Sequence, residues 1–254
     1  NLIPMKTYIF TFLLIAAQLY SQDRITGELF ATRSEVIAQN GMVASSHPLA
    51  TQIGIDILKK GGNAIDAAIA VNAALGLMEP TGCGIGGDLF AIVWDPKTKK
   101  LHGLNASGPS PQTLSLDFFL EKNYEVIPYY GALSVSVPGA VAGWTALHDK
   151  FGTLTMDQIL SPAIHYAENG FPLTELIAYY MQRSVQRFIR ADYPNIKETY
   201  MEPNGGKLPS EGEIFKNPLL AQTYKTIAKK GKQGFYSGKV ASAIAEEVLQ
   251  QGGF

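Results

Sequence analysis

An apolar helix that runs into a cluster of glycines most limits the folds open to this chain of 254 residues. Residues 64–78 are apolar on nearly every face of a helix, and Asp66 and Asn72 are the only polar side chains among them. Such a helix has no face suited to water and is expected inside a layered domain. The run is too short and too polar to be a membrane span.

Gly82, Gly84, Gly86 and Gly87 follow this helix and lead into an apolar strand over residues 89–94. Glycine at this density predicts backbone that passes close to another group, or φ values that other residues resist. Three of these glycines match the G-x-G-x-x-G spacing of dinucleotide-binding turns. Those turns follow a strand and open a helix, whereas the order here is reversed, so we do not expect a nucleotide site.

Local signals predict most of the remaining elements. A helix should begin at Pro48 and end before Gly61, which suits a left-handed C-terminal cap. Asn63 is expected to cap the next helix, with Asp66 at its positive end. Elsewhere the pattern predicts a hairpin that pairs 89–94 with 100–104, a loop over 105–111, a short strand over 134–137, helices near 139–150, 155–168, 174–190, 218–230 and 238–251, and an irregular polar stretch over 194–218.

The N-terminus has the pattern of an export signal. Met5 and Lys6 precede an apolar run over residues 8–17, and cleavage is expected near Ser21. Residues 1–21 are therefore predicted to be a signal peptide, with residues 1–4 an upstream extension. The mature protein would be periplasmic, secreted or extracellular. A buried N-terminal strand or helix is the alternative interpretation.

Composition excludes several classes of function. The net charge of −1 gives no reason to expect nucleic acid as a partner. A single cysteine, Cys83, excludes an internal disulfide framework and any multi-cysteine metal site. The four histidines show neither H-x-x-H nor H-E-x-x-H spacing, so no metal site is expected.

No catalytic constellation follows from the residues alone. Glu79 and Asp88 flank the glycine cluster and could form a carboxylate pair, or could be a helix-end residue and a turn former. Cys83 could be a nucleophile, but a small buried thiol is the favoured interpretation. These patterns indicate an exported α/β protein with a glycine-lined turn.

Several motifs taken together are more specific. They are Gly41-Met42-Val43-Ala44, Gly61-Gly62-Asn63-Ala64-Ile65-Asp66-Ala67-Ala68, Thr81-Gly82-Cys83-Gly84-Ile85-Gly86-Gly87, Val137-Pro138-Gly139-Ala140-Val141-Ala142-Gly143-Trp144, Pro162-Ala163-Ile164-x-Tyr166-Ala167-Glu168-x-Gly170-Phe171 and Gly234-Phe235-Tyr236-x-Gly238. From about residue 36 to the last residue, their order and spacing resemble the gamma-glutamyltransferase family.

The resemblance implies an N-terminal-nucleophile hydrolase with a four-layer αββα sandwich, incomplete in this stretch. In that family a precursor cuts itself into a large and a small subunit. The new N-terminal threonine of the small subunit attacks the γ-glutamyl amide of glutathione, with its own amine as base. The acyl group then passes to water or to an amino acid. The implied partners are a small γ-glutamyl substrate such as glutathione and the small subunit, and no cofactor is implied.

Two departures from the family pattern matter. Residues 22–254 correspond to the N-terminal part of the large subunit, so the nucleophile is expected elsewhere in the precursor and this stretch holds no catalytic residue. Ser107 stands where the family has an arginine that grips the α-carboxylate of the substrate. A neutral hydroxyl cannot replace a bidentate guanidinium there. Ser107 is thus our candidate substrate-binding residue.

Two other functions stay open at this point. The missing arginine favours an acylase of the cephalosporin or glutaryl type on the same fold. A noncatalytic exported binding protein is the other alternative. A threonine or serine directly after the cleavage point would support the enzymes, and its absence would support the binding protein.

Overall fold

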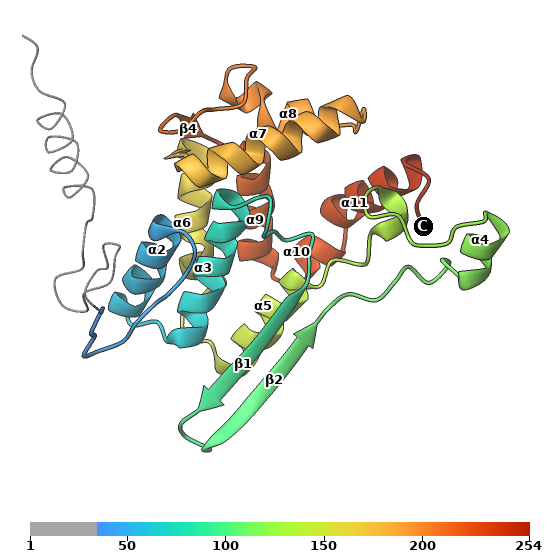
Figure 1. The fold of residues 1–254 in the computed structure, drawn as a ribbon. Helices are drawn as coiled ribbons and strands as arrows, with labels where there is room; N and C mark the ends of the chain where they lie inside the picture. The colour runs from blue at the N-terminus through green and yellow to red at the C-terminus, as the bar shows by residue number, and fades with distance from the viewer. Residues whose placement is uncertain (1–34) are drawn as a thin grey trace, which may run out of the picture. The chain divides into compact units, whose positions relative to one another are not determined.

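Helices predominate in the computed structural model, which describes residues 35–254 (Figure 1). The α-helices are α2 (Pro48–Lys59), α3 (Ala64–Met78), α4 (Leu116–Glu121), α5 (Ala140–Phe151), α6 (Met156–Asn169), α7 (Glu175–Arg190), α8 (Ile196–Tyr200), α9 (Pro218–Lys230), α10 (Gln233–Tyr236) and α11 (Lys239–Gln250). Ala132–Ser134 and Glu202–Asn204 are short 3₁₀ helices. The strands are β1 (Leu89–Asp95), β2 (Lys100–Ala106), β3 (Phe171–Pro172) and β4 (Ile214–Phe215). Residues 42–254 form one compact unit, and the description below concerns that unit.

Helix α3 lies at the centre of the core, as its all-round apolar sequence predicts. It packs against α2, α5 and α6, and α6 in turn packs against α9. Small side chains bring these helices close together. A Cβ atom on Gly54 of α2 would lie only 2.7 Å from a methyl group of Val71 in α3. The buried Tyr224 of α9 donates its hydroxyl proton to the Ala73 carbonyl of α3 at 2.9 Å.

A buried carboxylate fixes the beginning of α3 to the connection between α5 and α6. Asp66 is fully buried, and it accepts hydrogen bonds from the backbone amides of Asn63 at 2.9 Å and Thr153 at 3.0 Å. The Leu154 amide donates to it at 3.3 Å. Asn63 completes a capping box, because its side chain accepts from the amide of Asp66. The predicted cap is therefore confirmed, and it also joins segments about 90 residues apart.

Helix α2 begins at Pro48 as expected, but its N-cap is the imidazole of His47. This ring is 2% exposed, and its Nδ1 accepts from the Leu49 amide at 3.3 Å. Burial lowers the pKa of His47, with a smaller opposing effect of the Glu79 carboxylate. The ring therefore stays neutral near pH 7, and a neutral ring can keep Nδ1 as an acceptor. Gly61 after the helix has a φ of 91°, the left-handed cap that the sequence predicts.

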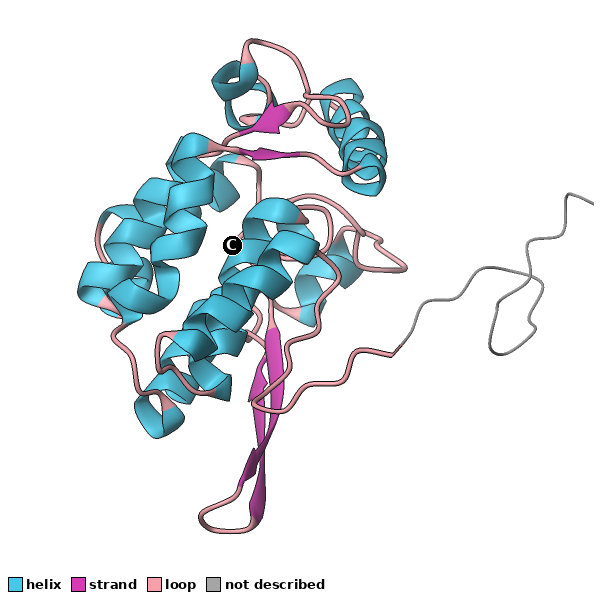
Figure 2. Ribbon diagram, turned by 90° about the vertical axis from the view of Figure 1, so that its left-hand side faces the viewer, coloured by secondary structure: helices cyan, strands magenta, loops and turns pink. Residues whose placement is uncertain are grey.

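The predicted hairpin is confirmed, and its two faces differ sharply. Strands β1 and β2 are antiparallel, with Leu89 opposite Ala106 and Asp95 opposite Lys100. The face that holds Leu89 and Ala106 packs on α5. The other face holds Phe90, Ile92 and Trp94, which are 67%, 79% and 59% exposed. Figures 1 and 2 both show the hairpin projecting from the helices.

Three expectations about the local structure need correction, and some short elements were not predicted. Residues 135–138 form no strand and follow the 3₁₀ helix Ala132–Ser134 as extended chain. Their neighbours explain this, because Pro109, Pro111 and Pro138 lack the amide protons that a ladder needs. The expected loop 105–111 begins two residues late, since β2 runs to Ala106. Helix α8 and strand β4 interrupt the stretch expected to be irregular, and α4, α10 and β3 were not predicted.

The expected four-layer sandwich and the expected signal peptide both extend beyond the residues that the structure describes. Residues 35–254 contain two two-stranded sheets, β1–β2 and β3–β4, so the fold is α/β but the four layers of a sandwich are not present in this part of the chain. The predicted signal peptide lies outside the described residues. Among residues 35–254, no helix is long and apolar enough to cross a membrane.

Candidate functional site

The glycine turn between α3 and β1 contacts Asn72, the polar side chain in the middle of α3. Asn72 accepts a hydrogen bond from the indole nitrogen of Trp144 at 2.8 Å. Its amide nitrogen lies 3.4 Å from Sγ of Cys83. Burial raises the pKa of Cys83, and the Glu79 carboxylate adds to this, so the thiol stays protonated near pH 7. The favoured interpretation of Cys83 as a packed thiol agrees with this geometry.

Three chain segments cross at the end of this turn. The Gly87 carbonyl accepts hydrogen bonds from the amides of Gly139 at 3.0 Å and Ala140 at 2.9 Å, so the turn is fastened to the N-terminus of α5. The Val137 amide donates to the Pro109 carbonyl at 2.9 Å. The crossing has no room for side chains. A Cβ atom on Gly139 would lie 1.9 Å from the carbonyl oxygen of Ala106.

This crossing brings Ser107 next to a carboxylate. The Ser107 hydroxyl donates to Oδ2 of Asp88 at 3.0 Å, and the Gly108 amide donates to Oδ1 of Asp88 at 3.1 Å. The amide of Ser107 donates to the side chain of Asn105 at 2.8 Å. Ser107 and Asp88 are both exposed. Ser107, the candidate substrate-binding residue, is thus paired with a negative charge.

The same turn borders a depression of about 390 Å³, here called the glycine-turn depression. Its lining residues are Asn72, Pro80, Thr81, Gly82, Cys83, Gly84, Gly86, Gly87 and Asp88. Glu79 is not among them, and its carboxylate instead accepts from the Ser46 hydroxyl at 2.7 Å. The hypothesis of a Glu79–Asp88 carboxylate pair therefore loses its geometric support, because the two groups bind different partners. Asp88 is left as the charged group of the site.

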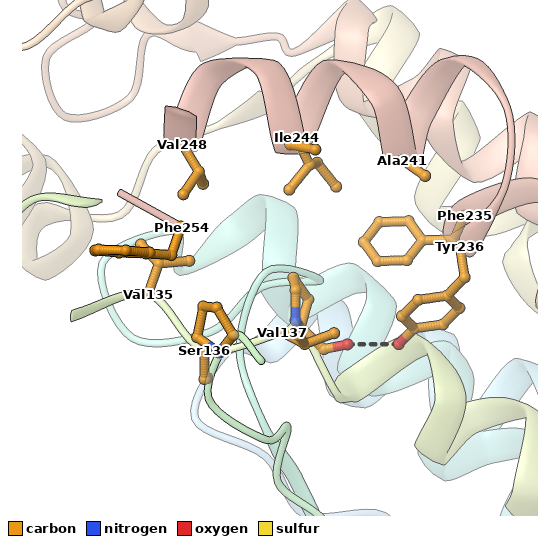
Figure 3. Close-up of a pocket in the computed structure, with 12 residues that line it drawn as sticks. Val135, Ser136, Val137, Phe235, Tyr236, Ala241, Ile244, Val248 and Phe254 are labelled. Carbon is orange, nitrogen blue, oxygen red and sulfur yellow. Dashed lines mark hydrogen bonds between the residues drawn. The ribbon is translucent and has the colours of Figure 1, made fainter. Parts of the chain in front are cut away.

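A second cavity is mostly apolar, and Ser136 and Tyr236 are the residues with polar side chains in its lining. It has a volume of about 250 Å³ and lies between α11 and the extended chain 135–138 (Figure 3). The Tyr236 hydroxyl lies at its edge, but it already donates to the Pro138 carbonyl at 2.6 Å and accepts from the Ala142 amide at 3.0 Å. Val135, Ile244 and Val248 supply methyl groups around it. This cavity is suited to packing against another apolar surface.

Comparisons with known proteins point to one family. A family profile described as Gamma-glutamyltranspeptidase matches residues 50–254. The chain is 39% identical over 221 residues to a glutathione hydrolase proenzyme of Bacillus subtilis (strain 168), an alignment that covers 85% of this chain and 37% of the relative. The chain thus spans less than two-fifths of that relative's length.

Two solved structures are also similar to the chain. A gamma-glutamyltranspeptidase of Helicobacter pylori superposes with a TM-score of 0.80 at 34% identity, covering 87% of this chain and 63% of that one. A cephalosporin acylase of Bacillus halodurans superposes with a TM-score of 0.82 at 40% identity, covering 90% of this chain and 43% of that one.

Proposed function

Because the chain belongs to the gamma-glutamyltranspeptidase family, we propose that it is the N-terminal part of the large subunit of a self-cleaving amide hydrolase or transferase. The whole protein would cleave γ-glutamyl amides such as glutathione and pass the acyl group to water or an amino acid. The family match over residues 50–254 carries this proposal. The nucleophile would come from the small subunit of the same precursor.

The exposed face of the hairpin supports the finer fold proposal, a four-layer αββα sandwich. Phe90, Ile92 and Trp94 lie on a strand that is apolar on both faces, as in sheets covered from both sides. Only one face is covered within residues 42–254. The remainder of the precursor would supply the further strands and the second covering layer. The export signal of residues 1–21 adds the proposal that the enzyme works outside the cytoplasm.

A specific observation favours a second candidate, an acylase acting on another acyl group. Asp88 lies within hydrogen-bond distance of Ser107, where a family member would hold a substrate carboxylate. Two negative charges about 4 Å apart repel by about 1 kcal/mol in water, and by more at a partly buried site. A donor without an α-carboxylate avoids this repulsion. The similarity to a cephalosporin acylase points in the same direction.

Expression of the full-length precursor tests the proposal. We expect it to cleave into two chains and to release p-nitroaniline from γ-glutamyl p-nitroanilide. Residues 22–254 alone should release none, because they hold no nucleophile. Full turnover of a 4-aminobutyryl anilide with none of the γ-glutamyl anilide would favour the acylase. An intact precursor without turnover of either donor would indicate a noncatalytic binding protein.

Substitutions that add a positive charge at Ser107 and remove the negative charge at Asp88 test whether the loop selects the acyl donor. In the full-length enzyme, Ser107→Arg combined with Asp88→Asn should raise kcat/KM for γ-glutamyl p-nitroanilide about tenfold relative to 4-aminobutyryl p-nitroanilide, which lacks the α-carboxylate. One charge-assisted contact is worth about 1.5 kcal/mol or more. Ser107→Arg alone should gain less, because Asp88 would hold the new guanidinium. Asp88→Asn alone measures how much of the change comes from removing the repulsion between Asp88 and the substrate carboxylate. An unchanged ratio in all three processed variants would remove Ser107 from the donor site.

A further inference from the structure

Helix α7 presents three arginines on one side without acidic partners. Arg183, Arg187 and Arg190 follow the i, i+4, i+7 spacing that brings side chains to one face of a helix. All three are exposed, and within residues 35–254 none of them forms a salt bridge. We call these three residues the arginine face. The i, i+4 pair of arginines repels, whereas the C-terminal position of Arg187 and Arg190 on α7 suits positive charge.

Tyrosines hold two of the three guanidinium groups in place without neutralising them. The Arg187 guanidinium donates to the Tyr130 hydroxyl at 2.7 Å and lies 5.7 Å from the centre of that ring. Arg183 hydrogen-bonds the Tyr179 hydroxyl and lies 5.4 Å from the centre of its ring. A guanidinium that is already ordered loses less conformational entropy when it binds an anion. The arginine face is therefore prepared to bind carboxylate groups.

The arginine face is joined to the glycine turn by adjoining depressions. It borders one of about 460 Å³, lined by Arg183, Gln186, Arg187, Arg190 and Ala191. Arg187 also borders a second depression of about 300 Å³, whose other lining residues include Pro80 and Thr81. Pro80 and Thr81 in turn line the glycine-turn depression. The three depressions therefore adjoin in series, with Asp88 in the lining at one end and three guanidinium groups at the other.

We propose that the arginine face binds carboxylates in the part of the donor substrate that extends away from the glycine turn. The inference rests on the proposed function, in which the donor is an acyl amide, and it adds that the preferred donors are acidic chains. The two ends of this series of depressions have opposite charge. Asp88 repels a carboxylate and the arginines attract one, so an acidic donor enters in one orientation.

Two donors of equal length test the inference in the full-length, processed enzyme. They are γ-glutamyl-aspartyl-aspartate and the neutral γ-glutamyl-asparaginyl-asparagine amide. The wild type should show a lower KM for the acidic donor, and added salt should shrink that difference. The triple variant Arg183→Gln, Arg187→Gln, Arg190→Gln should raise KM for the acidic donor about tenfold, since each exposed pair contributes a factor of a few. Its KM for the neutral donor and both kcat values should not change.

A second triple variant controls for the change in net charge. Lys229→Gln, Lys230→Gln, Lys232→Gln removes three positive charges at the end of α9 and just after it, and should leave both KM values unchanged. Equal KM values for the two donors in the wild type, or an equal rise in the lysine variant, would overturn the inference.

Binding of acetylated triaspartate, measured by calorimetry, separates the inference from the proposed function, because it needs no turnover. We expect the wild type to bind this peptide and the arginine variant to lose binding. That result in a protein without amidase activity would refute the proposed function and keep the arginine face as an anion site. Equal binding by both proteins would refute the arginine face.

Discussion

The Gly139→Ala variant of the full-length protein is expected to unfold with a free energy about 3 kcal/mol or more below that of the wild type. The new Cβ atom would meet the Ala106 carbonyl oxygen at 1.9 Å, and both sides of this contact are backbone. Relief requires that Gly139 and Ala140 move, and their amides then lose the Gly87 carbonyl. The strain therefore reaches the glycine turn and the loop that carries Ser107. Any γ-glutamyl anilide turnover should fall together with stability.

Gly103→Ala is the matched control for this prediction. Gly103 lies in β2 opposite Ile92, and a Cβ atom there meets no atom within 4 Å. Its unfolding free energy should fall by much less than that of Gly139→Ala, because no backbone atom of the described residues opposes the new methyl group. Urea unfolding of both variants measures the difference. Equal midpoints for Gly139→Ala and Gly103→Ala would contradict the close crossing described above.

The Asp66→Ala variant is expected to lose about 3–5 kcal/mol of unfolding free energy. Asp66 accepts hydrogen bonds from three backbone amides in two distant segments, and each donor left unpaired in the interior costs about 1–3 kcal/mol. Asp56→Ala serves as the control, because the Asp56 side chain is partly exposed and pairs, among the described residues, with Gln52 and Lys59 on its own helix. That control should lose less than about 1 kcal/mol. Similar thermal midpoints for the two variants would show that water replaces the Asp66 contacts.

Local signals predicted those elements whose causes lie within a few residues of each other. Pro48, Asn63 and Gly61 mark helix ends through their own backbone chemistry, and the structure has helix ends at these places. The hairpin was predictable because Asp95 forms the turn with side-chain bonds to Lys97 and Thr98. The strand predicted over 134–137 was wrong because its would-be partner is a proline-rich segment, and strand pairing depends on both partners.

The candidate site was less predictable than the fold, because its contacts join distant parts of the chain. Ser107 was identified by resemblance, but the hydrogen bond to Asp88 spans 19 residues and depends on the crossing at Gly139. The arginine face was visible in the sequence as a regular spacing along one helix. The spacing alone does not show whether a carboxylate pairs with these arginines. It also does not show that two tyrosines hydrogen-bond the guanidinium groups of Arg183 and Arg187.

The exposed side of the hairpin has a consequence for how the protein is made. If the precursor is as long as the Bacillus subtilis relative, about three-fifths of it lies outside the aligned part. Phe90, Ile92 and Trp94, which are exposed, are then synthesised long before translation ends. At about 5–20 residues per second, that interval lasts on the order of tens of seconds. Throughout this interval, the exposed apolar strand can pair with the same strand of a neighbouring nascent chain. Biosynthetic yield should therefore depend on a chaperone that shields this strand until translation is complete.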